Sequence, residues 1–456
     1  MARDQIDMTP IETRDELVAW IASGAKPKDK FRVGTEHEKF AFTLARHEPV
    51  PYEGPRGIQA LLAGMQMLLG WEAITEGPNL IGLSDVTGGG AISLEPGGQF
   101  ELSGAPVETI HQTAAELMAH LAQVREVARP LGIGFLGMGM TPNWTRAEMP
   151  MMPKGRYRIM TAYMPKVGKL GLDMMYRTCT VQANLDFSSE ADMVKKLRVG
   201  LALQPVATAL FASSPFTEGK PNGFLSFRSE IWRDTDPDRS GMLPWAFEPG
   251  MGFERWVDYA LDVPMYFVKR GERYIDVAGQ SFRDLLAGKL AALPGQRATI
   301  SDWANHLSTI FPEVRLKRYL EMRGADGGPW RRLPALPAFW VGLYYDDAAL
   351  DAAWELVKDW TAADRQRLRD EVPRLGMKTT IRGRAVIELA RDCLALARGG
   401  LSRRNRRDQA GHDETRYLEP LEDIVASGRT PAEEMLEKFH GIWRGSVDPV
   451  FSEYAY

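Results

Sequence analysis

A short hairpin that carries two acids constrains this chain more than any other stretch. Residues 91–103 read AISLEPGGQFELS, with a Pro-Gly-Gly turn between two arms in which apolar and polar residues alternate. Successive side chains of a strand point to opposite faces, so Glu95 and Glu101 share the polar face. Like charges on one sheet face repel each other. A single such acid is most simply a solvated side chain, and the pattern gains meaning because other segments repeat it.

Three further segments show the same alternation of apolar and polar residues. The polar faces of segments 31–42, 174–187 and 319–323 carry Glu36 and Glu38, then Gln182 and Asn184, and then Glu321 and Arg323. We predict that segment 174–187 is a strand throughout its length. Antiparallel strands with one apolar face need helices to cover that face. The pattern therefore predicts an α+β fold with a layered antiparallel sheet.

Helical periodicity predicts where the covering helices lie. Apolar residues recur at three- and four-residue steps in segments 13–21, 58–69, 107–132 and 191–211. After residue 340 the pattern is helical, over 351–361, 363–371, 384–397 and 431–443. We expect a catalytic domain over 1–340 and a helical C-terminal subdomain over 341–456 that packs on the same unit. Segment 149–164, rich in Met, Pro and Tyr, is expected to be a long loop, either a lid or an ordinary surface loop.

Composition excludes several classes of protein. The formal net charge is −4, whereas a general nucleic-acid binder is usually basic. Only two cysteines are present, which excludes a disulfide framework and favours a reducing compartment. No apolar run approaches the roughly 18 residues of a membrane helix, and the N-terminus lacks the apolar core of a signal peptide. We therefore expect a cytoplasmic protein without nucleic-acid or membrane partners.

The concentration of acids on one sheet face indicates a cation site. Glutamate oxygens are ligands for hard ions such as Mg²⁺ or Mn²⁺, and Mg²⁺ held by carboxylates commonly binds the phosphates of ATP. The chain has no P-loop, so metals and arginines would hold the phosphates. A G-x-G-x-x-G match at 132–137 follows a helix, the reverse of the dinucleotide motif, and is discarded.

Segment 227–241 is dense in Arg and Asp. Its arginines are Arg228, Arg233 and Arg239. One interpretation is a self-neutralised surface loop, in which ion pairs contribute little. The other is a set of guanidiniums that bind carboxylate or phosphate, to which the planar fork of arginine is suited.

Five stretches together resemble the plant-type glutamate–cysteine ligases, a family related in fold to glutamine synthetase. They read GTEHEKF at 34–40, LEPGGQFELS at 94–103, RTCTVQANLD at 177–186, RSEIWRDTDPDR at 228–239 and YLEMRGAD at 319–326. The resemblance covers roughly residues 31–443. It implies a glutamine-synthetase-like domain with a curved antiparallel sheet, and ATP-dependent ligation of L-cysteine to the γ-carboxylate of L-glutamate through γ-glutamyl phosphate. That reaction is the first step of glutathione biosynthesis.

The resemblance also implies roles for individual residues. Mg²⁺ ions would be held by Glu36, Glu38, Glu95, Glu101 and Glu321. Gln182, Asn184 and Arg323 would bind the nucleotide or orient the metal. Arg323 would neutralise the transferring phosphoryl group, and Arg228 would clamp the glutamate α-carboxylate, with Arg233 and Arg239 as alternatives for substrate binding. We expect a monomer or weak homodimer.

The sequence also allows other assignments of function. One is a related carboxylate–amine ligase with another amine acceptor, and another is a guanidino-kinase-type phosphotransferase, which would place a reactive cysteine at the site. A non-catalytic binding protein would gain nothing from so many costly acids. Cys179 falls on an apolar strand face and Cys393 within a helical pattern, so we predict two buried thiols. The cysteine-pair redox control of plant members is therefore expected to be absent.

Overall fold

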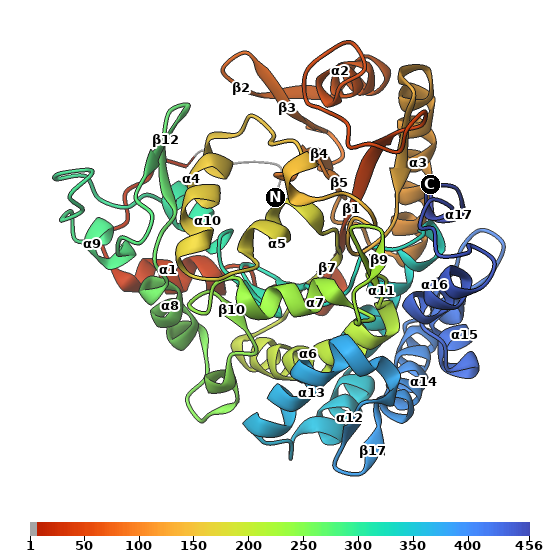
Figure 1. The fold of residues 1–456 in the computed structure, drawn as a ribbon. Helices are drawn as coiled ribbons and strands as arrows, with labels where there is room; N and C mark the ends of the chain where they lie inside the picture. Colours follow the sequence, from red (N-terminus) through yellow and green to blue (C-terminus); the bar gives the residue numbers. More distant parts are fainter. Residues whose placement is uncertain (1–6) are drawn as a thin grey trace.

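A nine-stranded antiparallel sheet organises the fold (Figure 1). The computed structural model describes residues 7–456. Its strands follow the order β14-β15-β7-β1-β5-β4-β3-β2, and β6 pairs with the far end of β1. Their bounds are β1 Val33–Thr43, β2 Glu72–Glu76, β3 Asn79–Ser84, β4 Ala91–Leu94, β5 Phe100–Ser103, β6 Ile133–Leu136, β7 Val181–Leu185, β14 Val314–Leu316 and β15 Leu320–Met322. The expected α+β class with an antiparallel sheet is confirmed.

Strand register brings the predicted polar residues together. Glu38 of β1 lies opposite Glu101 of β5, and Glu36 lies opposite Gln182 of β7. On the far side of β7, Asn184 pairs with Glu321 of β15. Because the side-chain period of a strand is two, this register places the acids of separate segments on one face.

Long helices cover the apolar face of the sheet. The four predicted before residue 340 are present as α1 Arg14–Ala22, α2 Ile58–Leu69, α3 Ile110–Leu131 and α6 Glu190–Phe211. Helix α3 begins with a capping box of Thr109 and Gln112 and ends at Gly132, whose φ of 71° is in the left-handed region that favours glycine. Helix α6 is buried along most of its length, since it lies between the sheet and the C-terminal helices.

The C-terminal third is helical, as predicted. Its helices are α11 Ala335–Tyr344, α12 Asp347–Val357, α13 Ala362–Leu375, α14 Val386–Arg404, α15 Glu419–Ser427, α16 Pro431–His440 and α17 Val450–Glu453. One continuous cluster of buried apolar side chains includes Leu197 of α6, Trp340 of α11 and Leu394 of α14. These helices therefore share the core of the sheet, and a division at residue 340 stays a prediction.

Two predictions of local structure before β7 were wrong. Segment 174–187 is not one strand, because α5 (Gly171–Arg177) precedes β7; a buried ion pair of 2.9 Å between Asp173 and Arg177, one turn apart, stabilises this short helix. Segment 149–164 is not a long loop, because it contains α4 (Gly155–Tyr163). A residue of β2 holds the first turn of α4, because the Gly155 N–H donates to Glu76 at 2.7 Å.

Smaller elements complete the chain between β7 and α11. The helices are α7 Phe227–Ile231, α8 Phe253–Asp262, α9 Phe282–Leu286 and α10 Ile300–Leu307. Segment 227–241, predicted as a loop, therefore begins with a helix. Two-stranded ribbons join β8 Phe216–Thr217 with β9 Lys220–Pro221, β10 Ser240–Gly241 with β13 Phe311–Pro312, β11 Phe267–Arg270 with β12 Arg273–Asp276, and β16 Thr380–Ile381 with β17 Arg384–Ala385.

Within residues 7–456, every helix is too short or too polar to cross a bilayer. Residues 1–6, on which the prediction about a signal peptide rests, lie outside the described part of the chain. Both cysteines are buried free thiols, as predicted. Cys179 packs with Phe40, Phe42 and Leu136 in a separate apolar cluster.

Candidate active site

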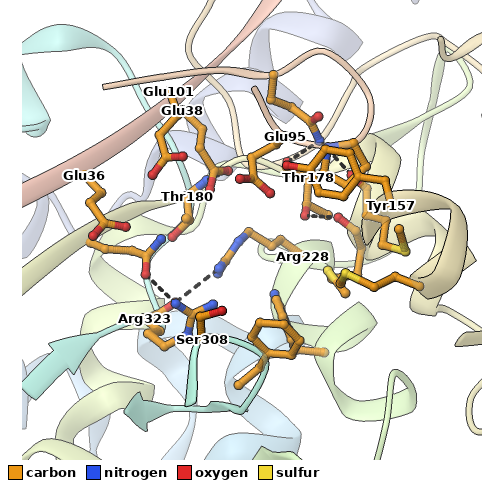
Figure 2. A pocket seen from close by; sticks show the side chains of 18 of the residues that line it. Glu36, Glu38, Glu95, Glu101, Tyr157, Thr178, Thr180, Arg228, Ser308 and Arg323 are labelled. Atoms are coloured by element: carbon orange, nitrogen blue, oxygen red, sulfur yellow. Dashed lines mark hydrogen bonds between the residues drawn. The ribbon is translucent and has the colours of Figure 1, made fainter. Parts of the chain in front are cut away.

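A cavity of about 110 Å³ lies against the polar face of the sheet. Figure 2 shows carboxylates from β1 and the β4–β5 hairpin on one side and Arg228 and Arg323 on the opposite side. Predicted site residues in the lining are Glu36, Glu38, Glu95, Glu101, Gln182, Arg228 and Arg323. The structure therefore brings together seven of the predicted residues from five separate segments.

Hydrogen bonds fix three of the four carboxylates. The Thr180 N–H donates to Glu38 Oε2 at 2.9 Å, and Asn184 Nδ2 donates to Glu36 Oε1 at 2.9 Å. Glu101 accepts from two hydroxyls that flank it in the sheet, Ser93 at 2.6 Å and Ser103 at 3.2 Å. The four acids form what we call the acid wall: Glu36, Glu38, Glu95 and Glu101.

Two carboxylates of the acid wall, those of Glu38 and Glu95, are electrostatically unfavourable without a cation. Burial, followed by the charges of Glu95 and Glu101, raises the pKa of Glu38 well above its ordinary value. Burial and the charge of Glu101 likewise raise the pKa of Glu95. A carboxylate whose pKa is raised in this way is destabilised in its charged form. A divalent cation would remove that cost.

Cations dominate the opposite wall of the cavity. Arg228, only 3% exposed, donates through Nη2 to the carbonyl of Arg323 at 3.1 Å. Arg323 donates to Gln182 Oε1 at 2.5 Å. Arg315 also lines the cavity and was missed by the sequence analysis, although it stands in the same alternating run as Arg323. Lys154 and Arg156, at the start of α4, also line the cavity, and Lys154 lies on the side of the acid wall, where its Nζ donates to the Leu94 carbonyl at 2.9 Å.

Glu321 does not line this cavity. Its side chain is fully buried and forms ion pairs with Arg315, with Lys317 at 2.5 Å and with Arg323 at 3.7 Å. Burial alone would raise the pKa of Glu321, but the charges of these three neighbours hold it below its ordinary value. One carboxylate thus accompanies three cations, and we call Arg315, Lys317 and Arg323 the cation cluster. A metal-binding role for Glu321 stays a prediction.

Two of the three candidate substrate arginines lie elsewhere. Arg233 pairs with Glu230 at 2.7 Å and with Asp370 at 2.9 Å. Arg239 is fully buried and pairs with Asp236 at 2.6 Å. Neither residue lines the cavity, and only Arg228 of the three faces the acid wall.

A second, larger cavity of about 460 Å³ adjoins the first, and Glu36 lines both. Its lining includes Asn184 and Lys317, so the predicted nucleotide residues Gln182 and Asn184 face different cavities. Trp20 and Tyr319 supply aromatic surface, and the remaining basic lining residues are Lys26, Arg32 and Arg318. Cavities of this volume with apolar walls and few convergent polar groups are typical of small-molecule sites.

The acid wall is not a closed metal centre in this structure. Within residues 7–456, no three His, Cys, Asp or Glu side chains are gathered closely enough to hold a metal ion by themselves. The carboxylates line an open cavity instead. This arrangement fits Mg²⁺, which commonly keeps several waters and takes one or two carboxylates together with substrate phosphates.

Comparison with solved structures gives the class of protein first. The chain superposes on a glutamate–cysteine ligase from Francisella tularensis, solved in complex with AMP, with a TM-score of 0.55 and 12% identity over 93% of this chain and 89% of that one. At this identity the likeness concerns the fold. The chain thus shares its fold with that glutamate–cysteine ligase.

The family follows from the sequence comparison. The model of the glutamate–cysteine ligase family 2 matches residues 32–453. The chloroplastic glutamate–cysteine ligases of Nicotiana tabacum and Arabidopsis thaliana are each 60% identical over 97% of this chain and 83% of their own length. The chain belongs to the glutamate–cysteine ligase family, and the predicted enzyme of the first step of glutathione synthesis is confirmed.

The same relatives correct the expected location. The glutamate–cysteine ligases of Nicotiana tabacum, Arabidopsis thaliana and Medicago truncatula are all named chloroplastic. The prediction of a cytoplasmic protein was therefore wrong. It depended on a low cysteine count and a polar N-terminus, and neither feature distinguishes the cytosol from other reducing compartments.

Proposed function

We propose that the chain joins L-glutamate and L-cysteine in an ATP- and Mg²⁺-dependent reaction at the cavity between the acid wall and the cation cluster. The observation that carries this proposal is the separation of charge across one cavity. Four carboxylates line one side, and Arg228, Arg315 and Arg323 line the other. Arg315 and Arg323 share the buried carboxylate of Glu321 with Lys317, which lines the second cavity. A ligand that carries both cations and a polyanion would neutralise both sides.

A complex of Mg²⁺ with ATP has this distribution of charge. Glu38, Glu95 and Glu101 would hold Mg²⁺ ions, with one or two carboxylates on each ion, and these ions would supply charge neutralisation to the phosphates. Arg323 and Arg315 are placed to bind the phosphoryl oxygens from the other side. Phosphoryl transfer depends mainly on positioning and on stabilisation of charge, so fixed arginines in a partly closed cavity suit it.

The second cavity suits the nucleoside part of ATP. It is the larger of the two, it has aromatic and glycine surface, and it joins the first cavity at Glu36. The nucleotide would then extend from the second cavity, past Lys317, into the first. Asn184, which holds Glu36 at the junction, would orient the metal ligand there.

The reaction balances as two displacements. The glutamate γ-carboxylate attacks the γ-phosphorus of ATP and releases ADP, which gives γ-glutamyl phosphate. The cysteine amine then attacks the acyl carbon and releases phosphate and a proton. Arg228 is placed to hold the glutamate α-carboxylate through its guanidinium fork, opposite the acid wall.

The test is ADP release from Mg²⁺-ATP and glutamate, with cysteine, with 2-aminobutyrate, or with no acceptor. Release that requires glutamate and an amine, together with γ-glutamylcysteine found by mass spectrometry, would support the proposal. Turnover with 2-aminobutyrate would show that the thiol is dispensable for the chemistry. Release that is unaffected by EDTA, or absent with every acceptor, would refute it.

A further inference from the structure

Asp326 is a buried carboxylate just beyond β15, the strand that carries Glu321. Its side chain has no exposure to solvent, and it lines neither cavity. Burial of a charge is costly unless hydrogen bonds or an opposite charge compensate for it. The hydrogen bonds of Asp326 therefore indicate which part of the structure this carboxylate holds in place.

Three hydrogen bonds hold the Asp326 carboxylate. Oδ2 accepts from the Ser213 N–H at 2.9 Å and from the Ser214 hydroxyl at 2.6 Å. Oδ1 accepts from the Ser226 hydroxyl at 2.8 Å. All three serines are buried, so these bonds are shielded from water. Burial raises the pKa of Asp326, whereas the positive charge of Arg228 and these bonds oppose that shift.

The hydroxyls of Ser214 and Ser226 connect the Asp326 carboxylate to the helical turn that carries Arg228. Ser226 is the N-cap of α7, and its Oγ accepts from the Ser229 N–H at 3.3 Å. The Ser214 Oγ, which donates to Asp326, accepts from the Arg228 N–H at 3.1 Å. One carboxylate thus fixes the first turn of α7, from which the Arg228 side chain extends into the cavity (Figure 2).

The segment around Asp326 is also linked to the acid wall through Thr180. Asp326 forms an isolated bridge with Thr180, and the Thr180 hydroxyl donates to the Ala325 carbonyl at 2.7 Å. Thr180 in turn donates its N–H to Glu38. Space around the carboxylate is tight, because a Cβ at Gly139 would lie 2.5 Å from the Asp326 carboxyl carbon. The position of Asp326 is therefore closely defined.

We propose that Asp326 is a positioning residue for the ligase reaction, which sets Arg228 opposite the acid wall through Ser214 and Ser226. This inference rests on the proposed role of Arg228 in binding glutamate. Asp326 touches no substrate in this scheme and acts only through the arginine. Small misplacements of a binding group reduce turnover strongly, so a substitution at Asp326 should change the kinetics of the enzyme.

The test compares Asp326→Asn and Ser214→Ala with a control at another buried aspartate. Asp302 accepts from the Thr299 N–H and hydroxyl at 2.9 Å and pairs with Arg270 at 2.7 Å, away from both cavities. Asp302→Asn should lower stability and leave the kinetics unchanged. We expect Asp326→Asn and Ser214→Ala to raise the glutamate KM by about tenfold or more, with the cysteine KM unchanged.

A double mutant separates positioning from general destabilisation. If Asp326 acts through Arg228, then Asp326→Asn combined with Arg228→Lys should be no worse than the worse single variant. Additive losses, or an unchanged glutamate KM in both Asp326→Asn and Ser214→Ala, would overturn the inference. Should Asp326→Asn fail to fold, Ser214→Ala decides alone. An unchanged KM in Arg228→Lys would instead overturn the role of the arginine itself, and the inference with it.

Discussion

Replacement of Glu38 by Gln should stabilise the free enzyme while it abolishes turnover. Glu38 and Glu101 are direct partners across β1 and β5, and the Cβ atoms of such partners lie about 5 Å apart. Two unit charges at about 5 Å in an effective dielectric of about 20 repel each other by about 3 kcal/mol. The carboxylates can spread apart, so we expect the free energy of unfolding to rise by about 1–3 kcal/mol in EDTA at a pH above the raised pKa of Glu38, where both acids are charged.

Glu38→Gln removes the negative charge of the side chain and keeps its hydrogen bond. A glutamine oxygen can still accept the Thr180 N–H, so the bond of 2.9 Å that holds the side chain is retained. The matched control is Glu414→Gln, because Glu414 is equally a buried carboxylate but pairs with Arg404 and accepts the Ile110 N–H at 2.7 Å. That variant should lose stability, since it removes the charge that pairs with the half-buried guanidinium of Arg404.

Urea denaturation in EDTA and in Mg²⁺-ATP measures both effects. Mg²⁺-ATP should stabilise the parent, and the gain should grow with the ratio of its concentration to its dissociation constant. It should stabilise Glu38→Gln much less. A Glu38→Gln variant that is less stable than the parent in EDTA, or that keeps more than a small fraction of the parent's turnover, would contradict this prediction. Either result would mean that repulsion within the acid wall is not what the bound cation relieves.

Three further predictions concern substrate binding, pH and packing. Arg228→Lys should raise the glutamate KM by about tenfold with a smaller change in kcat, because a point charge cannot replace a bidentate fork; steady-state kinetics in glutamate test this, and an equal fall in kcat would contradict it. Burial lowers the pKa of His306 from 6.5 to about 4. The unfolded chain therefore binds a proton between these pH values that the folded chain does not, and the free energy of unfolding should fall by about 3 kcal/mol as the pH drops from 6.5 to 4. Denaturation across this range should be flatter in His306→Gln, and an equally steep profile would refute the assignment. Gly400→Ala should lower stability by about 1–3 kcal/mol, since its Cβ would lie 1.9 Å from a backbone oxygen of α11. In Gly399→Ala the nearest atom is a flexible arginine end at 3.2 Å, so thermal unfolding should show little loss or a gain.

Sequence alternation predicted the acid wall because the side-chain period of a strand is fixed. Once Glu36, Glu38 and Glu101 are assigned to strands, their shared face follows, and antiparallel pairing leaves little freedom in register. The resemblance then assigned these acids to one site together with Gln182, Arg228 and Arg323. That is why the four acids, Gln182, Arg228 and Arg323 were all found in one cavity.

The failures came where tertiary contacts decide local structure. Residues 174–177 have strand-like composition, and a short run does not reveal its period. They form the end of α5 because Arg177 pairs with Asp173 in a buried position. The start of α4 depends on Glu76, a residue of β2 that is distant in sequence. Arg233 and Arg239 could not be separated from Arg228 by composition, since only the fold shows which of them already have acidic partners.

The charges of the site explain why its two sides do not simply neutralise each other. The acid wall is held to the sheet by hydroxyls and amide N–H groups, and the cation cluster is held by its own carboxylate, Glu321. Each side is thus fixed at a distance from the other, with a cavity between them (Figure 2). Collapse would relieve the raised pKa of Glu38 but would close the site. The free enzyme therefore retains an electrostatic cost, and a ligand that brings both metal and phosphate gains binding energy where it removes that cost. This difference between the free and bound states is why a change that stabilises the free protein, Glu38→Gln, is expected to destroy its activity.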